Sequence, residues 1–270
     1  MQTQLDLVEI KSRNNVQIAG KGDRTMLFAH GFGCDRTMWR YITPNFEADY
    51  RVVTFDLVGS GRSDISAFDL TRYSTLEGYA RDILEVAEVL ELESAILVGH
   101  SVSAMLGAIA AIEQPNRFSQ LIMVAPSPRY INDPPNYFGG FERADLDEMF
   151  DLMDKNYMGW ANFLAPLAMG EQNPEQAKEL ETSFCSTDPV TARTFAKATF
   201  YSDKRSILPQ VPIPCLILQC ADDSIAPPEV GDYVHQQLPQ STLQRMSATG
   251  HCPHLSYPKE TIEAIRNYLK

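Results

Sequence analysis

A serine between a predicted strand and a predicted helix is the first residue of this sequence that could carry out chemistry. Ser101 stands in Gly99-His-Ser-Val-Ser103, directly after the apolar run Ser94–Val98 and directly before the helical run Ala104–Ala111. A G-x-S-x-G pattern in this context places the serine hydroxyl on a sharp, exposed turn. The N-terminus of the following helix also offers partial positive charge to an oxyanion formed beside it. The spacing therefore predicts Ser101 as a nucleophile.

The pattern is incomplete, because Ser103 occupies the position of the last glycine. A crowded turn would have to accommodate its extra hydroxymethyl group. Taken alone, a Gly-x-Ser after a strand is more often a turn that caps a helix than a catalytic site. The assignment therefore depends on finding a base and a carboxylate elsewhere in the chain.

Both partners are present, in the chain order Ser, Asp, His. His251 lies in a loop between the predicted strand Thr242–Ser247 and the last helix, and two acids, Asp222 and Asp223, follow the predicted strand Cys215–Gln219. An activated serine needs a base to take its proton, and the base needs a carboxylate that fixes its tautomer. This chain order is that of α/β-hydrolases. We favour Asp223 as the acid, although the spacing does not separate it from Asp222.

His254 is the alternative to His251, three residues further on. We favour His251, because the glycine before it lets the chain turn toward the strand ends, and we expect His254 to support the loop. The two histidines could also be imagined as metal ligands, but the sequence has no further His or Cys pair at ligand spacing. The sequence therefore predicts no metal site and no cofactor.

Two backbone amides are predicted to hold the oxyanion. One belongs to Val102, the residue after the nucleophile, and the other to Phe32, in the glycine-rich turn that ends the run Leu27–Gly33. A nucleotide loop is the competing interpretation for His30–Gly33 or for Gly59–Gly61. Neither segment completes G-x-G-x-x-G or a Walker pattern, so we disfavour it.

The elements that must position these residues alternate between short β-branched runs and helical patterns, as in a mostly parallel sheet covered on both faces. Ser74-Thr-Leu-Glu77 is expected to form a capping box at the start of one helix, and Asp188-Pro189 to begin another. The seven predicted strands are Val16–Ala19, Thr25–Ala29, Tyr50–Phe55, Ser94–Val98, Ser119–Val124, Cys215–Gln219 and Thr242–Ser247.

The alternation stops after Val124 and resumes near Pro212, and the segment between reads as helices. We therefore expect an all-helical cap on one end of the sheet, rich in aromatic side chains. The predicted organisation is a first part of the core over residues 1–126, a cap over 127–208 and a second part of the core over 209–270.

Composition limits the partners. Thirty-five acidic and 23 basic residues give a net charge of -12, which disfavours nucleic acid and anionic membrane surfaces. The longest apolar stretch, Ala104–Ile112, is far shorter than the roughly 20 residues that span a bilayer. The first ten residues lack a basic start and an apolar core, so the expected location is the cytoplasm. Five cysteines without a C-x-x-C pair are expected to be reduced and structural.

Several strings, in order along the chain, closely resemble one small α/β-hydrolase group, which contains the bacterial stress-signalling hydrolase RsbQ and the plant karrikin and strigolactone receptor hydrolases. The strings are His30-Gly-Phe-Gly-Cys-Asp35, Arg72-Tyr-Ser-Thr-Leu-Glu-Gly-Tyr79, Gly99-His-Ser-Val-Ser-Ala-Met105, Asn132-Asp-Pro-Pro135, Tyr137-Phe-Gly-Gly-Phe141 and Gly250-His-Cys-Pro-His-Leu-Ser256. The resemblance implies an α/β-hydrolase fold with a mostly parallel central sheet flanked by helices and a helical cap inserted after the sixth strand. The chain is similar to the plant members in having serine at position 103. The resemblance also places the family's acid on Asp223.

The resemblance also implies a ligand pocket. Its expected wall consists of Phe32 and a set of cap residues: Tyr130, Phe141, Trp160, Leu164 and Phe200. Phe163-Leu164 departs from the plant pattern, whereas Phe184–Pro189 and Leu218–Asp222 look more like the bacterial type, which favours a bacterial origin.

Two functions follow as expectations. The first is a serine hydrolase that cleaves a small, mainly apolar ester, lactone or butenolide, such as a strigolactone- or karrikin-like ligand, through an acyl-serine intermediate. The second is a signalling protein in which slow hydrolysis or ligand capture drives interaction with a protein partner. Dehalogenation on this fold uses an aspartate nucleophile, so Ser101 argues against it.

Overall fold

A seven-stranded sheet forms the centre of the molecule in the computed structural model, which describes residues 6–170 and 172–270. The strand order is β1-β3-β2-β4-β5-β6-β7, and every neighbouring pair is parallel except β1 with β3. The strands are β1 (Gln17–Ala19), β2 (Arg24–Ala29), β3 (Tyr50–Thr54), β4 (Ala95–His100), β5 (Phe118–Val124), β6 (Cys215–Gln219) and β7 (Ser241–Arg245). Each lies within two residues of a predicted run at either end, because short β-branched runs are strong local signals.

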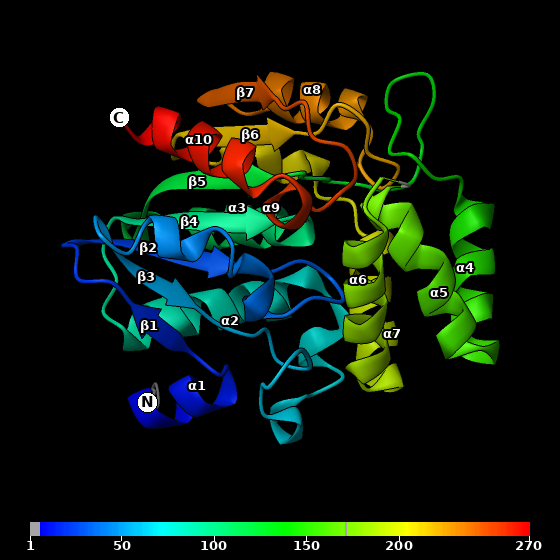
Figure 1. The fold of residues 1–270 in the computed structure, drawn as a ribbon, viewed down its shortest axis with the longest axis horizontal. Helices are drawn as coiled ribbons and strands as arrows, with labels where there is room; N and C mark the ends of the chain where they lie inside the picture. Colours follow the sequence, from blue (N-terminus) through cyan, green and yellow to red (C-terminus); the bar gives the residue numbers. More distant parts are fainter. Residues whose placement is uncertain (1–5, 171) are drawn as a thin grey trace.

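Helices cover both faces of the sheet. Successive residues of a strand point to opposite faces, and both sets are buried here. In β2, Leu27 and Ala29 face one core, whereas Met26 and Phe28 face the other. Figure 1 shows α10 in front of the sheet and α2 and α3 behind it. The helices outside the cap are α1 (Leu7–Arg13), α2 (Leu76–Val89), α3 (Val102–Glu113), α8 (Pro228–Gln237), α9 (Pro253–Ser256) and α10 (Pro258–Leu269).

Four helices form a cap at the end of the sheet toward which the parallel strands point (Figure 1), and they share an apolar cluster with the loops at that end. They are α4 (Arg143–Lys155), α5 (Tyr157–Met169), α6 (Pro174–Ser186) and α7 (Pro189–Phe200). The carboxylate of Asp188 accepts hydrogen bonds from the amides of Val190 and Thr191, so the predicted start of α7 is confirmed. Among the described residues, no helix is both long and apolar enough to cross a bilayer.

Short 3-10 helices complete the chain: η1 (Arg36–Trp39), η2 (Thr43–Asn45), η3 (Ile65–Ala67), η4 (Arg72–Ser74), η5 (Pro115–Arg117) and η6 (Arg205–Gln210). The fold class predicted from the sequence is confirmed, with two corrections of detail.

The first correction concerns the place of the cap. The chain leaves the sheet after β5, the fifth described strand, and not after the sixth. The resemblance implies six strands before the cap, whereas only five of the seven predicted runs precede it. The segment before β1 forms α1, because Asp6 accepts hydrogen bonds from the amides of Val8 and Glu9 and so caps a helix there.

The second correction concerns the start of α2. Ser74 belongs to η4 and donates its hydroxyl to the carbonyl of Thr71, while the Glu77 carboxylate pairs with Lys204. Thr75 is therefore the N-cap residue, and the predicted Ser74 to Glu77 capping box does not form. The side chains of Ser74 and Glu77 both bind other partners in the folded chain.

Candidate active site

The backbone of Ser101 has a strained conformation. The residue lies between β4 and α3 with φ 56° and ψ −124°, a region that non-glycine residues rarely occupy. Its amide donates to the Val124 carbonyl over 2.8 Å, which ties the turn to β5. Gly99 is required because a Cβ there would lie 2.4 Å from the Ser103 carbonyl oxygen. The sharp turn between β4 and α3 thus presents Oγ above the end of the sheet.

Three side chains from distant segments form one hydrogen-bonded chain. Ser101 Oγ lies 2.7 Å from His251 Nε2, and His251 Nδ1 lies 2.8 Å from Asp223 Oδ2. All three residues are buried, with 3–5% of each exposed. Because Asp223 can only accept, His251 carries its proton on Nδ1 and leaves Nε2 free to accept the serine proton. The arrangement is that of a nucleophile, its base and an orienting acid.

The structure separates the two adjacent acids. The second oxygen of Asp223, Oδ1, accepts from the amides of Ile225 and Ala226 at 2.8 and 3.0 Å, which fixes the carboxylate with Oδ2 toward His251. The side chain of Asp222 is exposed, and only its backbone carbonyl serves the loop, by accepting from the Gly250 amide at 2.7 Å. It is therefore the Asp223 carboxylate that meets the imidazole.

The predicted oxyanion donors come from two segments, the start of α3 and the turn after β2. Val102 is the first residue of α3, and Phe32 belongs to the turn after β2. Within residues 6–170 and 172–270, no hydrogen-bond acceptor is found for either amide. Ser103 does more than fit the crowded turn, because its hydroxyl donates to the His30 carbonyl and so fastens α3 to that turn.

The loop that carries His251 is held from below and from the cap. His100 Nε2 donates to the His251 carbonyl over 2.8 Å, and the His251 amide donates to the Ala168 carbonyl in α5 over 2.6 Å. Gly250 has φ 81°, and a Cβ there would lie 2.3 Å from the Met169 carbonyl oxygen. The backbone of His251 is therefore bonded directly to a cap helix.

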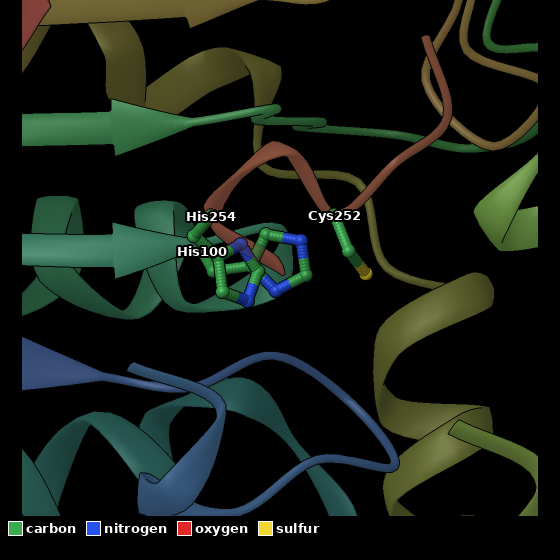
Figure 2. A group of neighbouring side chains, drawn as sticks. All are labelled: His100, Cys252 and His254. Atoms are coloured by element: carbon green, nitrogen blue, oxygen red, sulfur yellow. The ribbon is translucent and has the colours of Figure 1, made fainter. Parts of the chain in front are cut away.

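His100 at the end of β4 and Cys252 and His254, which follow His251 along the chain, bring their nitrogen and sulfur atoms within 4.8 Å of one another (Figure 2). The sequence analysis does not predict this group, because no local pattern connects His100 with the loop near the C-terminus. Burial lowers the pKa of His254 to about 3, lowers that of His100 and raises that of the Cys252 thiol. All three groups are therefore neutral near pH 7.

This group fits packing better than metal coordination. His100 Nε2 is already bonded to the His251 carbonyl, and its Nδ1 faces Gly31, where a Cβ would lie 2.4 Å away. In the view of Figure 2, the Cys252 sulfur points away from both imidazoles. The His254 ring packs 4.6 Å from Trp39 and 4.4 Å from His100, so it supports the loop.

An apolar pocket opens above Ser101. Of the residues expected in its wall, Phe32, Tyr130, Leu164 and Phe200 line it. Trp160 lies one layer behind, with its ring 6.1 Å from Phe32 and 5.0 Å from Phe184. Phe141 lines a groove on the outside of the cap instead. The other residues of the pocket wall are Cys34, His100, Ser101, Ala168, Leu180, Phe184, Thr199, Ile225, His251 and Cys252.

Residues 26–264 match the family model described as the alpha/beta hydrolase family. The chain belongs to the alpha/beta hydrolase family. The predicted resemblance to the karrikin and strigolactone receptor hydrolases is confirmed by three relatives. A probable esterase from Oryza sativa subsp. japonica is 41% identical over 97% of each chain. A karrikin insensitive 2 receptor from Petunia hybrida is 40% identical over 96% of this chain and 97% of the relative. A strigolactone esterase from Pisum sativum is 40% identical over 90% of this chain and 92% of the relative.

Among solved structures, a hydrolase from Oleispira antarctica superposes with a TM-score of 0.97 and 47% identity, over 98% of this chain and 97% of that chain. An esterase from Exiguobacterium antarcticum superposes with a TM-score of 0.86 at 20% identity, over 94% of each chain, and shows the shared fold alone.

Sequence reasoning missed part of the pocket wall of this alpha/beta hydrolase. Phe184 packs on Phe32 with ring centroids 5.8 Å apart, although it was considered only as part of the string Phe184–Pro189. Cys34 lies two residues after Phe32, and Cys252 lies one residue after His251. Both line the pocket, although the sequence analysis treats them only as structural cysteines. Their position in strings that also hold Phe32 and His251 was the available signal.

Proposed function

We propose that this protein is a serine hydrolase that cleaves a small, mainly apolar ester or lactone through an acyl-serine intermediate. The observation that carries the proposal is the buried hydrogen-bonded chain from Ser101 through His251 to Asp223, which opens into the apolar pocket. The alpha/beta hydrolase family and the esterase names of two relatives support the same reaction class.

The chemistry follows from the geometry. Ser101 Oγ attacks the carbonyl carbon while His251 Nε2 takes its proton, and the Phe32 and Val102 amides hold the oxyanion. Collapse expels the alcohol or enol oxygen, which takes the proton from His251. Water then attacks the acyl-serine with His251 as base, and a carboxylic acid leaves with Oγ protonated again. Asp223 keeps the imidazole in the required tautomer throughout.

The wall of the pocket indicates the substrate class. Apolar and aromatic side chains dominate it, and no Lys or Arg is among its residues in the described part of the chain. A neutral compound with an ester or butenolide carbonyl fits such a pocket better than an ionic one. Strigolactone- or karrikin-like butenolides are therefore the first ligands to test.

The test is the turnover of 4-nitrophenyl acetate by Ser101→Ala. We expect kcat to fall by several orders of magnitude with little change in Tm, because the substitution removes the nucleophile and leaves the core packed. Ser119→Ala is the matched control, since Ser119 lies in β5 near its amino end, where its hydroxyl donates to the Ser94 carbonyl. Undiminished hydrolysis by Ser101→Ala would exclude Ser101 as the nucleophile.

One contact favours ligand sensing as a second function. The His251 amide donates to the Ala168 carbonyl in α5, so a change at the base reaches the cap directly. A signalling partner protein would then read the cap surface after slow hydrolysis or ligand capture. The assay adds a panel of butenolides, including both enantiomers of a strigolactone analogue. Steady release of many equivalents of product supports the enzyme, whereas a burst that stalls, with a ligand-dependent change in Tm, supports the sensor.

A further inference from the structure

The hydroxyl of Tyr130 touches the proposed nucleophile. Tyr130 Oη lies 3.2 Å from Ser101 Oγ, the same oxygen that lies 2.7 Å from His251 Nε2. A serine hydroxyl has one proton, and His251 Nε2 can only accept it while Nδ1 donates to Asp223. The proton between Tyr130 and Ser101 must therefore come from the tyrosine, which donates to Oγ in the resting protein.

Tyr130 is well placed to remain a donor. Its side chain is 1% exposed and packs against Phe200, with ring centroids 5.0 Å apart. Its own carbonyl accepts from the Phe141 amide at 3.1 Å, and Gly139 approaches the same backbone so closely that a Cβ would lie 2.5 Å away. Burial raises the pKa of this phenol well above its usual range, so the hydroxyl stays protonated throughout the neutral pH range.

A donor on Oγ affects the two half-reactions differently. During acylation, Oγ changes from a hydroxyl oxygen, which accepts well, to an ester oxygen, which accepts poorly. During deacylation, the C–Oγ bond breaks, its electron pair stays on Oγ, and negative charge grows there until the proton arrives from His251. Only an interaction that is stronger in the transition state than in the preceding ground state accelerates a step. The Tyr130 bond therefore assists the departure of Oγ more than its attack.

We propose that the Tyr130 hydroxyl is a further catalytic group, which sets the lifetime of the acyl-serine by stabilising Ser101 Oγ as the leaving oxygen in deacylation. This inference rests on the proposed hydrolase function and deepens it, because the lifetime of the acyl-serine separates a turnover enzyme from a slow, ligand-capturing sensor. The tyrosine gives a hydrogen bond and keeps its proton, and His251 supplies the proton that Oγ takes up in deacylation.

The test compares Tyr130→Phe with wild type in rapid mixing with 4-nitrophenyl acetate. The first-turnover release of nitrophenol reports acylation, and mass spectrometry of acid-quenched samples reports the fraction of chain that carries an acetyl group. We expect the deacylation rate to fall about fivefold to tenfold, as for the loss of one hydrogen bond. The acylation rate should change by less than about twofold, and acetylated Ser101 should accumulate.

Tyr137→Phe is the matched control. Tyr137 is equally buried, and its hydroxyl donates to the Arg129 carbonyl away from the pocket. Its removal should leave both rates unchanged. An acyl-serine lifetime in Tyr130→Phe equal to that of wild type, or an equal fall in both rates, would overturn this inference alone. Absence of an acetylated serine in wild type and variants alike would overturn the proposed function and this inference together.

Discussion

Asp223→Asn tests whether the carboxylate acts by fixing the tautomer of His251. In the native site, Asp223 Oδ1 accepts from the Ile225 and Ala226 amides, and Oδ2 accepts from His251 Nδ1. An asparagine carbonyl must take the first position, because the opposite orientation would place its NH₂ against two backbone donors at 2.8 and 3.0 Å. The NH₂ group then faces His251 Nδ1.

This orientation reverses the tautomer. The asparagine NH₂ donates to His251 Nδ1, so the imidazole proton moves to Nε2 and points at Ser101 Oγ. The base can no longer accept the serine proton. We expect kcat to fall about 10⁴-fold, as in the corresponding substitution of a serine-protease triad, which equals about 5.5 kcal/mol at 1.36 kcal/mol per tenfold. The fold should persist, because the backbone amides of Ile225 and Ala226 keep an acceptor.

The assay is the steady-state hydrolysis of 4-nitrophenyl acetate near neutral pH, with Tm measured on the same samples. Asp222→Asn is the matched control, since it makes the same chemical change on an exposed side chain one residue away. We expect its kcat within about twofold of wild type, as for a surface side chain without a role in the reaction. A kcat of Asp223→Asn within tenfold of wild type, or an equal loss in Asp222→Asn, would refute the tautomer argument.

Gly33→Ala should lower the free energy of unfolding by about 1–3 kcal/mol and weaken substrate binding, because Gly33 has φ 70° and a Cβ would lie 1.8 Å from Phe184 in the pocket wall. Gly170→Ala is its control in thermal melts, since φ is 75° there but the nearest atoms are 3.7 Å away, and equal losses would contradict the clash. Burial lowers the pKa of His254 to about 3, so on acidification the unfolded chain binds this proton before the folded chain does. The free energy of unfolding of wild type should therefore fall relative to that of His254→Leu between pH 6.5 and pH 3. The expected slope is up to about 1.4 kcal/mol per pH unit. Parallel stability curves in urea titrations would contradict that linkage, and His254→Leu should keep most of its esterase activity because His254 does not touch the triad.

Local patterns in the sequence determined the secondary structure and the order of the candidate site. The seven β-branched runs correspond to β1 to β7, and the turn at Ser101 stands at the predicted junction of a strand and a helix. Strand and turn signals are encoded over a few residues, so they survive without knowledge of the rest of the chain. Ser101, Asp223 and His251 each come after a predicted strand, so their order along the chain could be predicted from the sequence.

Only the tertiary structure decided which atoms meet. Asp222 and Asp223 have the same local sequence signal, and the amides of Ile225 and Ala226 orient one of them toward His251. The Ser74 to Glu77 capping box was lost because Lys204, far along the chain, takes the Glu77 carboxylate.

Phe184 and Cys34 reach the pocket from different segments, which sequence spacing does not connect. The contact between Tyr130 and Ser101 also depends on how the segment after β5 runs over the site. Side-chain direction in loops is set by long-range packing and hydrogen bonds, and these exist only once the chain has folded.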